Sequence, residues 1–351
     1  MIKRVLLSTL NYDHPQKGMS QAFSSLFPEV REYDYLKLQR EGRSQAEISQ
    51  GLLAVVREFQ PDWIWLQLQD SKTIGPESLV RIREEVPRTV ISHWMGDCQP
   101  SPSPYMASIC RVTHLTLLSN VGQLPLYRAA GAKKAHYCQI GVDWDEDVLG
   151  IPEWTPPFRI PEIVLCGNFY GNRFPGTADR VDAIQALMAE KLDVGIVGWG
   201  WPPEFPVVGG CTVKKQHHVW RRAKVALNVN HFNDIELYYS DRQLIAMASG
   251  TPLVCAYVPG LEREFREGMD CLWYREPDEL VAKVKDLLGS EEMRIRIGRE
   301  GRSTILRRHT WWHRILEILP VVEEIRSGLP EPISASPAEP LGEPVPELKS
   351  T

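Results

Sequence analysis

Short apolar runs alternate with amphipathic stretches along the first part of the chain. Runs that predict strands lie at residues 3–10, 30–36, 62–66, 89–94, 114–118 and 135–138, and stretches with helical spacing lie at 20–27, 45–59, 76–86, 103–110 and 121–130. Because a helix follows each of the first five strands, the pattern predicts a parallel, doubly wound α/β sheet in a domain of residues 1–148.

The alternation resumes after a proline-rich segment. Residues 149–161 hold four prolines, a stiff composition that breaks helices and is expected of a linker between domains. Further strands are predicted at 162–166, 193–197, 225–230 and 253–256, with helices at 179–190, 278–287, 291–308 and 311–325. We therefore predict a second domain over residues 162–308 and a final helix within 309–327. Residues 328–351 contain six prolines and four glutamates, which predicts a disordered acidic tail.

One stretch of the second domain combines a loop, a helix and a strand around polar groups. Ser240 predicts a helix N-cap, with its hydroxyl on a first-turn N–H, and Asp241 suits the positive end of the helix. Gly250 ends the helix before the strand at 253–256. An open helix N-terminus binds phosphate, and Arg242 adds a bidentate donor for it. The alternative is an ordinary capped helix in an α/β domain.

This stretch resembles the C-terminal domain of GT-B glycosyltransferases, especially the CgeB-like, group 1 branch. In that branch an S-x-R leads a helix that ends in M-A-x-G before a strand. The matching residues here are Ser240, Arg242, Met247, Ala248, Ser249 and Gly250, followed by Thr251-Pro252-Leu253-Val254; downstream they are Leu261, Phe265, Gly268, Leu272, Tyr274, Asp278-Glu279-Leu280, Arg294, Gly301 and His309-Thr310. The resemblance covers most of residues 160–318.

The resemblance implies two Rossmann-like domains that face each other across a cleft, with the last helix returning to the N-terminal domain. It also implies transfer of a sugar from a nucleotide diphosphate to an acceptor hydroxyl, with the donor held mostly by the C-terminal domain. The family usually places a glutamate on the donor ribose three residues after the arginine, where this chain has Ile245. Asp241 or Glu236 would have to take over that contact through a different loop geometry.

Further candidates for donor binding follow predicted strands, where ligands of open α/β sheets lie. Arg173 could meet phosphate, and Gly18 could allow close backbone approach in the first loop. The resemblance adds the G-N-x-Y loop, the base position at the strand end near Trp199, and the A-K pair before a strand. The full set is Gly18, Gly167, Asn168, Arg173, Gly198, Trp199, Lys224, Ser240, Asp241, Arg242 and Gly250. Plain turns and a solvated basic helix face are the alternatives.

The acceptor side is predicted at a W-x-G-D corner after the strand at 89–94. Asp97 is a candidate to accept a proton from the acceptor hydroxyl or to bind that hydroxyl, and His93 is the second candidate. The resemblance supports this corner, with His93 where asparagine is commoner. The alternatives are that Asp97 caps the helix near 103–110 and that His93 is a core residue.

Bulk composition narrows the class of protein. The chain has 351 residues, 43% hydrophobic and 24% charged, with net charge −5, as expected of a soluble globular protein without a generally basic surface. Its start lacks the apolar run of a signal peptide, and no run is long enough to span a membrane. Seven scattered cysteines without a C-x-x-C pair indicate reduced thiols, a cytoplasmic location and no zinc site.

The sequence therefore predicts a metal-independent glycosyltransferase with no bound cofactor and a nucleotide-diphosphate sugar, UDP-sugar first, as co-substrate. The acceptor and the oligomeric state stay open. Three other functions also stay open: a viral-type DNA-base glycosyltransferase, which needs a basic groove; a nucleotide-sugar epimerase, which needs several carboxylates or histidines in the cleft; and a non-catalytic sugar-binding descendant.

Overall fold

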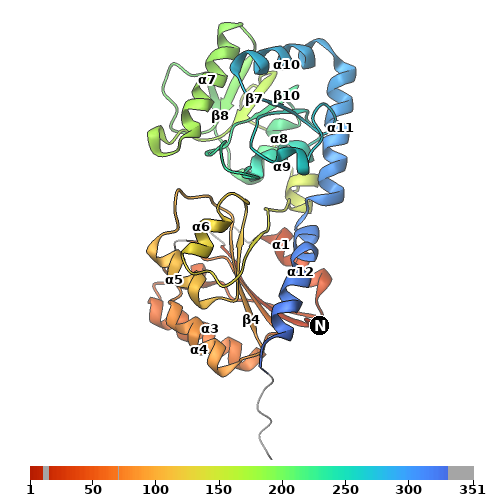
Figure 1. Cartoon of the computed structure of the whole chain (residues 1–351). Helices are drawn as coiled ribbons and strands as arrows, with labels where there is room; N and C mark the ends of the chain where they lie inside the picture. The colour runs from red at the N-terminus through yellow and green to blue at the C-terminus, as the bar shows by residue number, and fades with distance from the viewer. Residues whose placement is uncertain (11–15, 70, 331–351) are drawn as a thin grey trace, which may run out of the picture.

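The computed structural model describes residues 1–10, 16–69 and 71–330. Most of the predicted acidic tail, residues 331–351, lies outside the described residues, as does most of the first polar loop. Two lobes lie end to end, with the N-terminal lobe in red to yellow and the C-terminal lobe in green to blue (Figure 1). Each lobe holds one six-stranded sheet covered by helices, so the predicted class of two doubly wound α/β domains is confirmed.

The sheet of the N-terminal lobe is parallel throughout, in the order β2-β1-β3-β4-β5-β6. Its strands are β1 (Arg4–Ser8), β2 (Glu29–Glu32), β3 (Trp63–Leu66), β4 (Val90–Met95), β5 (Leu115–Leu118) and β6 (Ala135–Tyr137). Its helices are α1 (Lys17–Leu26), α2 (Tyr35–Arg40), α3 (Gln45–Phe59), α4 (Pro76–Glu85), α5 (Pro104–Val112) and α6 (Leu124–Ala129). The strand predicted at 30–36 is too long: Asp34 accepts the Lys37 N–H at 2.9 Å and starts a helix there.

The sheet of the C-terminal lobe is also parallel, in the order β12-β11-β10-β7-β8-β9. Its strands are β7 (Ile163–Cys166), β8 (Val194–Val197), β9 (Val207–Gly209), β10 (Val225–Asn228), β11 (Leu253–Ala256) and β12 (Leu272–Tyr274). Its helices are α7 (Gly176–Ala189), α8 (Val213–Trp220), α9 (Asp241–Ala248), α10 (Pro277–Gly289) and α11 (Glu291–Arg308), with single turns η2 (Gly171–Arg173) and η3 (Leu261–Arg263). The short strand β9 has no counterpart among the predicted elements.

The chain crosses between the lobes twice. The first crossing follows β6 and passes through the π-helical turn η1 (Trp144–Leu149). The second lies between α11 and α12 (Trp311–Ser327), and α12 lies beside α1 in the lower lobe (Figure 1). Trp311 and Ile315 of α12 are buried in the same core as Trp65 and Trp94 of the N-terminal sheet. The last helix is therefore part of the N-terminal lobe, although the whole C-terminal lobe precedes it in the sequence.

No helix among the described residues is long and apolar enough to cross a membrane. All seven cysteines are buried free thiols, which is consistent with the expected reduced state.

Candidate active site

A cavity of about 450 Å³ lies between the two lobes. In each sheet the strand order reverses once, between β1 and β3 in the first and between β7 and β10 in the second. Ligands of open α/β sheets bind outside the carboxyl ends of the strands at such reversals. Leu10 and Gln67, which follow β1 and β3, line the cavity from one side, and Tyr170 and His231, which follow β7 and β10, line it from the other. The cavity therefore lies at the point where the strand order reverses in both sheets.

The N-terminus of α9 opens into this cavity, where Ser240, Asp241 and Arg242 line the wall. Ser240 occupies the N-cap position, as predicted, but its hydroxyl does not accept a first-turn N–H and donates instead to Asn228 Oδ1 at 3.3 Å. The Asp241 carboxylate accepts the Arg242 N–H at 2.9 Å. The Ser240 N–H is held by Asn230 Oδ1 at 3.0 Å. This pair of asparagines fixes the chain before α9 and leaves the positive end of the helix dipole directed at the cavity.

Within the described residues, Arg242 has only a long ion pair and no hydrogen bond to an acid. Its side chain is 17% exposed, and its nearest carboxylate is Asp241, at 4.0 Å. Among the described residues its guanidinium has no hydrogen-bond acceptor, so its five N–H groups are available to a ligand. Ile245 lines the cavity one turn further along α9 and brings no carboxylate. Of the two substitutes considered for the family glutamate, Asp241 reaches the cavity, whereas Glu236 is paired with Arg263.

Asp97 lies opposite α9, just after β4, and is open to the cavity. Asp97 keeps an exposed surface within the cavity, but the surrounding protein partly desolvates its carboxyl; this desolvation, followed by repulsion from Asp241, raises the pKa of the carboxyl. A hydrogen bond from Gln69 and the charge of Arg242 act in the opposite direction. The alternative role as a helix cap is wrong, because Ser103 caps α5 by accepting the Met106 N–H at 3.2 Å.

His93 is not part of the site. Its ring is fully buried within β4, it does not line the cavity, and neither ring nitrogen has a partner among the described residues. Burial lowers the pKa of His93 to about 3, so the ring is neutral. The prediction failed because strand residues alternate between faces, and this register turns His93 into the sheet packing rather than to the end of the strand.

Gly18 permits a close approach within the chain itself. Its N–H donates to Asp143 Oδ2 at 2.5 Å, and a Cβ at this position would lie 2.5 Å from the same oxygen. Asp143 also accepts the N–H groups of Asp145 and Glu146 at 2.9 and 3.0 Å. One carboxylate thus holds the starts of α1 and η1 together, and the Gly18 amide is occupied by the protein instead of by a ligand.

Carboxylates dominate the cavity lining near η1. Asp143, Glu146 and Asp147 line it there, and burial raises the pKa of Asp147 well above the usual range. Glu146 is paired with Lys214 of α8, and Asp147 accepts the Asp143 N–H at 2.8 Å. The cavity thus presents carboxylates on the N-terminal side (Asp97), at the crossing, and at the start of α9 in the C-terminal lobe (Asp241).

Two predicted donor residues lie at the wrong edge of the second sheet. Lys224 precedes β10, and its ammonium pairs with Glu162 at 2.6 Å, at the amino ends of the strands. Gly250 adopts φ +84° at the far end of α9 and does not line the cavity. Neither reaches the cavity, because the helix or strand they border separates them from its open end. The basic run does contribute Lys214.

Five predicted residues lie at the correct edge but beside the cavity rather than on its wall. Gly167, Asn168 and Arg173 follow β7, and Gly198 and Trp199 follow β8. Asn168 Oδ1 accepts the Trp199 N–H at 3.0 Å, which ties the two loops together. Gly198 lies so close to the Gly167 carbonyl that a Cβ would collide with it.

Two side chains of these loops stay on the outside. The Trp199 ring is exposed, and the Arg173 guanidinium lies over the Phe174 ring at 5.2 Å. In this structure both are neighbours of the site rather than part of its wall. Tyr170 and His231, which the sequence analysis did not select, line it instead. Tyr170 belongs to the quoted G-N-x-Y loop, so the sequence contained a pattern from which it could have been predicted to line the cavity. No sequence pattern indicated His231.

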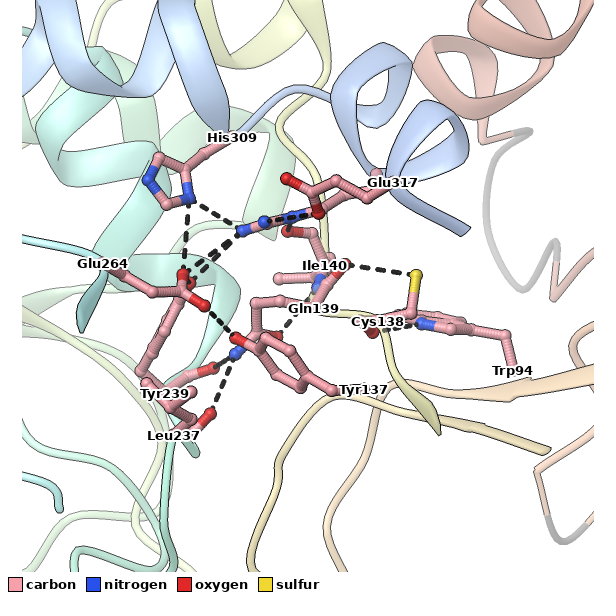
Figure 2. Close-up of polar contacts among 11 residues, drawn as sticks. Trp94, Tyr137, Cys138, Gln139, Ile140, Leu237, Tyr239, Glu264, His309 and Glu317 are labelled. Carbon is pink, nitrogen blue, oxygen red and sulfur yellow. Dashed lines mark hydrogen bonds and ion pairs between the residues drawn. The ribbon is translucent and has the colours of Figure 1, made fainter. Parts of the chain in front are cut away.

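A polar network forms the back of the cavity and joins the lobes (Figure 2). Glu264 accepts hydrogen bonds from the hydroxyls of Tyr137, at the end of β6, and Tyr239, just before α9. Arg314 of α12 lies 3.6 Å from Glu264 and donates to His309 Nδ1 at 2.7 Å. Burial and then Arg314 lower the pKa of His309 well below its usual value, so His309 accepts as a neutral ring.

Gln139 extends this network to the cavity wall. Its amide donates to the carbonyls of Leu237 and Tyr239 at 3.3 and 3.4 Å, and its oxygen accepts the Ile140 N–H at 2.8 Å (Figure 2). Gln139 and Tyr239 both line the cavity. The first crossing is therefore bonded directly to the segment that leads into residues 240–242.

The described residues contain no group of three or more His, Cys, Asp or Glu side chains arranged to hold a metal ion.

The sequence comparison finds a family similar to part of the chain. Residues 180–320 match the family model described as glycosyl transferase-like. The comparison with curated protein sequences finds no match.

Solved structures match over nearly the whole chain at low sequence identity. HepE of Anabaena, solved with UDP, has TM-score 0.60 and 12% identity over 92% of this chain and 100% of its own. A glycosyltransferase of Rickettsia africae has TM-score 0.63 and 10% identity, over 93% and 99%. Sucrose-phosphate synthase of Thermosynechococcus elongatus has TM-score 0.57 and 12% identity, over 93% and 99%. At these identities the likeness establishes the fold.

Three findings agree with one another. They are the two Rossmann-like lobes with a shared cavity, the solved structures with a similar fold, and the family match at residues 180–320. They confirm the predicted resemblance to the group 1, CgeB-like branch: the chain has the GT-B fold, and its residues 180–320 are similar to the glycosyl transferase-like family.

Proposed function

We propose that this protein transfers a sugar from a nucleotide-diphosphate sugar to an acceptor hydroxyl. The observation that carries the proposal is the guanidinium of Arg242, which has no hydrogen-bond acceptor among the described residues, beside the N-terminus of α9, both on the cavity wall. A diphosphate leaving group needs positive charge already in place as the sugar departs. HepE has been solved in complex with UDP and with UDP-glucose, which supports UDP-sugars as the first donors to test.

In the proposed reaction the bond from the anomeric carbon to the diphosphate oxygen breaks, and a bond to the acceptor oxygen forms. Arg242 and the start of α9 neutralise the charge that develops on the diphosphate, so the proposal requires no metal ion. Asp97, across the cavity, takes the proton of the acceptor hydroxyl. A carboxylate with a raised pKa is a stronger base than ordinary aspartate, which suits it to this step.

The charge of the lining also bears on the acceptor. Carboxylates on the N-terminal side would repel the phosphates of a nucleic acid, so the lining does not favour the DNA-base alternative. We propose a neutral, hydroxyl-bearing acceptor, such as a glycan or a small molecule.

The test is donor binding by Arg242→Ala. Charge-assisted hydrogen bonds contribute about 1.5–3 kcal/mol, so the UDP affinity should fall roughly 10- to 100-fold in calorimetric titration while the melting temperature stays near wild type. The matched control is Arg263→Ala, an arginine paired with Glu236 outside the cavity lining, which should leave the affinity unchanged. Wild-type protein that binds none of UDP, GDP and ADP, with or without EDTA, would refute the proposal.

A nucleotide-sugar epimerase is the second candidate, because the cavity does contain the several carboxylates that this chemistry needs. Incubating the protein with the donor alone separates the two functions. Conversion of the sugar to its epimer, followed by proton NMR, would favour the epimerase. Slow release of nucleoside diphosphate to water without epimer would favour the transferase, and binding without either reaction would favour a non-catalytic descendant.

A further inference from the structure

Arg180 of α7 is buried directly beneath the donor side of the cavity. It is 2% exposed, its Nε donates to the Val229 carbonyl at 2.9 Å, and its Nη1 donates to the Asn168 carbonyl at 3.0 Å. Val229 follows β10 and Asn168 follows β7, the two strands on either side of the reversal in the second sheet. One side chain thus ties together the two loops that begin at this reversal.

Arg180 also lies next to Gly167. A Cβ on Gly167 would be in ordinary van der Waals contact with Arg180 Nη1, at 3.7 Å, so the guanidinium lies close beneath the turn that follows β7. The loop after β10 continues through His231, which lines the cavity, to the segment that holds Ser240. Arg180 is therefore connected to the donor wall through backbone on both sides, although it does not line the cavity itself.

The positive charge of Arg180 is not neutralised by any described carboxylate, since both of its hydrogen bonds go to neutral carbonyls. Burying a charge without a partner is costly, so such an arginine is rare unless its charge is used. Burial, and then the neighbouring charge of Arg242, lower the pKa of Arg180 to about 9, as expected of a cation that lacks a counter-charge.

The same wall gathers further positive charge. Burial lowers the pKa of His231 to about 3, and Arg180, Arg242 and Arg173 add to this effect in that order. Three guanidiniums thus act on one ring at the cavity wall, and none of the three has a carboxylate closer than the 4.0 Å between Arg242 and Asp241 within the described chain. Three guanidiniums with only one acid, Asp241, at ion-pair distance form a site suited to an anion.

We propose that Arg180 is a positioning residue for the donor diphosphate, which holds the loops after β7 and β10 in place and adds its buried charge to the attraction exerted by Arg242. The inference rests on the proposed function, because it requires a diphosphate in the cavity. It differs from a purely structural role in that a neutral residue with the same hydrogen bonds would not replace Arg180.

The experiment compares three variants with two ligands. Arg180→Lys keeps the charge with a single donor group, Arg180→Gln keeps a hydrogen-bond donor without the charge, and Arg180→Met keeps neither. Each is titrated with UDP and with uridine, which lacks the phosphates, and circular dichroism and melting curves establish that it folds. Arg294→Met is the matched control, because Arg294 also donates to two carbonyls, at 2.6 and 2.9 Å, but lies on α11 away from the cavity lining.

We expect Arg180→Gln and Arg180→Met to bind UDP roughly tenfold more weakly. This is the effect of one unit charge at a distance of about 12 Å through an effective dielectric constant of about 20. Arg180→Lys should stay within about threefold of wild type, and uridine binding should change little in all three. The salt dependence of UDP affinity should also weaken in the two neutral variants. Arg294→Met should lower the melting temperature without changing UDP affinity.

Two outcomes would overturn the inference while the proposed function stands. One is UDP affinity at the wild-type level in a folded Arg180→Gln protein. The other is an equal loss of UDP and uridine affinity in the lysine and methionine variants, which would show a structural role alone. Wild-type protein that binds neither UDP, GDP, ADP nor inorganic pyrophosphate would refute the diphosphate site itself, and the proposed function with it.

Discussion

The network around Glu264 makes a quantitative prediction about how the two lobes are held together. Glu264 is 11% exposed and lies 3.6 Å from Arg314, whose side chain is 4% exposed. The second carboxylate near Arg314 is Glu317, at 3.2 Å and 55% exposed. One arginine thus has a buried and an exposed partner, and the two partners provide a matched comparison.

Glu264→Gln should destabilise the protein by about 3 kcal/mol. Removing one member of a buried ion pair costs about 3–5 kcal/mol, because the remaining charge stays buried without compensation. We expect the lower end, since Arg314 keeps Glu317 and no direct hydrogen bond joins it to Glu264. Tyr137 and Tyr239 donate to different oxygens of Glu264, so the single glutamine oxygen can still accept from one of these hydroxyls, while the glutamine NH2 can donate to the other hydroxyl oxygen. Glu317→Gln should cost no more than about 1 kcal/mol, as for exposed ion pairs.

Urea unfolding followed by tryptophan fluorescence measures both changes, because Trp65, Trp94 and Trp311 are buried in the core that α12 shares with the N-terminal sheet. A shift of the midpoint with an unchanged slope gives the loss of stability. Adding Tyr137→Phe to Glu264→Gln tests whether the lobes are coupled here. If both residues belong to one network, the double variant should lose less free energy of unfolding than the sum of the losses in the two single variants. Equal, small losses in Glu264→Gln and Glu317→Gln, or strict additivity with Tyr137→Phe, would refute this account.

Two further predictions separate the site from its surroundings. Lys224→Ala should leave UDP affinity within about twofold of wild type, because this ammonium pairs with Glu162 at the opposite edge of the sheet; a tenfold loss in the same titration would contradict the structure of this edge. Asp97→Asn should lower turnover roughly 100-fold with donor affinity nearly unchanged. Turnover is measured with a hydroxyl acceptor or as donor hydrolysis, and wild-type turnover in this variant would argue against a role for Asp97 as base.

The elements that could be predicted from the sequence are those whose signals are local. The helices at 45–59 and 291–308 and the strand at 253–256 have the observed bounds, because cap residues and apolar periodicity determine them within a few residues. The helix at Tyr35–Arg40 was missed because the apolar spacing around Asp34 also fits a strand, and only the side-chain bond to Lys37 decides between them. The strand β9 has three residues, which are too few to show the alternation of apolar and polar positions that predicts a strand.

The site was predictable where it follows from topology. Residues 240–242 and Asp97 follow directly from strand ends or open a helix, and such positions reach the crevice of a doubly wound fold. Lys224, Gly18 and His93 were wrong for three different reasons. The basic run around Lys224 crosses from one edge of the sheet to the other, Gly18 accommodates Asp143, and His93 points into the packing of β4. Each outcome depends on a contact between residues far apart in the sequence, which no local pattern contains.

The distribution of charge in the cavity links donor binding to the chemistry at Asp97. Arg242 lowers the pKa of Asp97, whereas burial and Asp241 raise it. A diphosphate bound at Arg242 would neutralise that cation and bring further negative charge into the cavity, and both changes disfavour the ionised carboxyl. The pKa of Asp97 should therefore be higher in the donor complex than in the free protein. Activity needs the ionised form of a base and falls as pH drops through this pKa, so the acid limb of kcat should lie at higher pH than that of kcat/KM. Coincident limbs, or limbs unchanged in Asp97→Asn, would show that another group titrates.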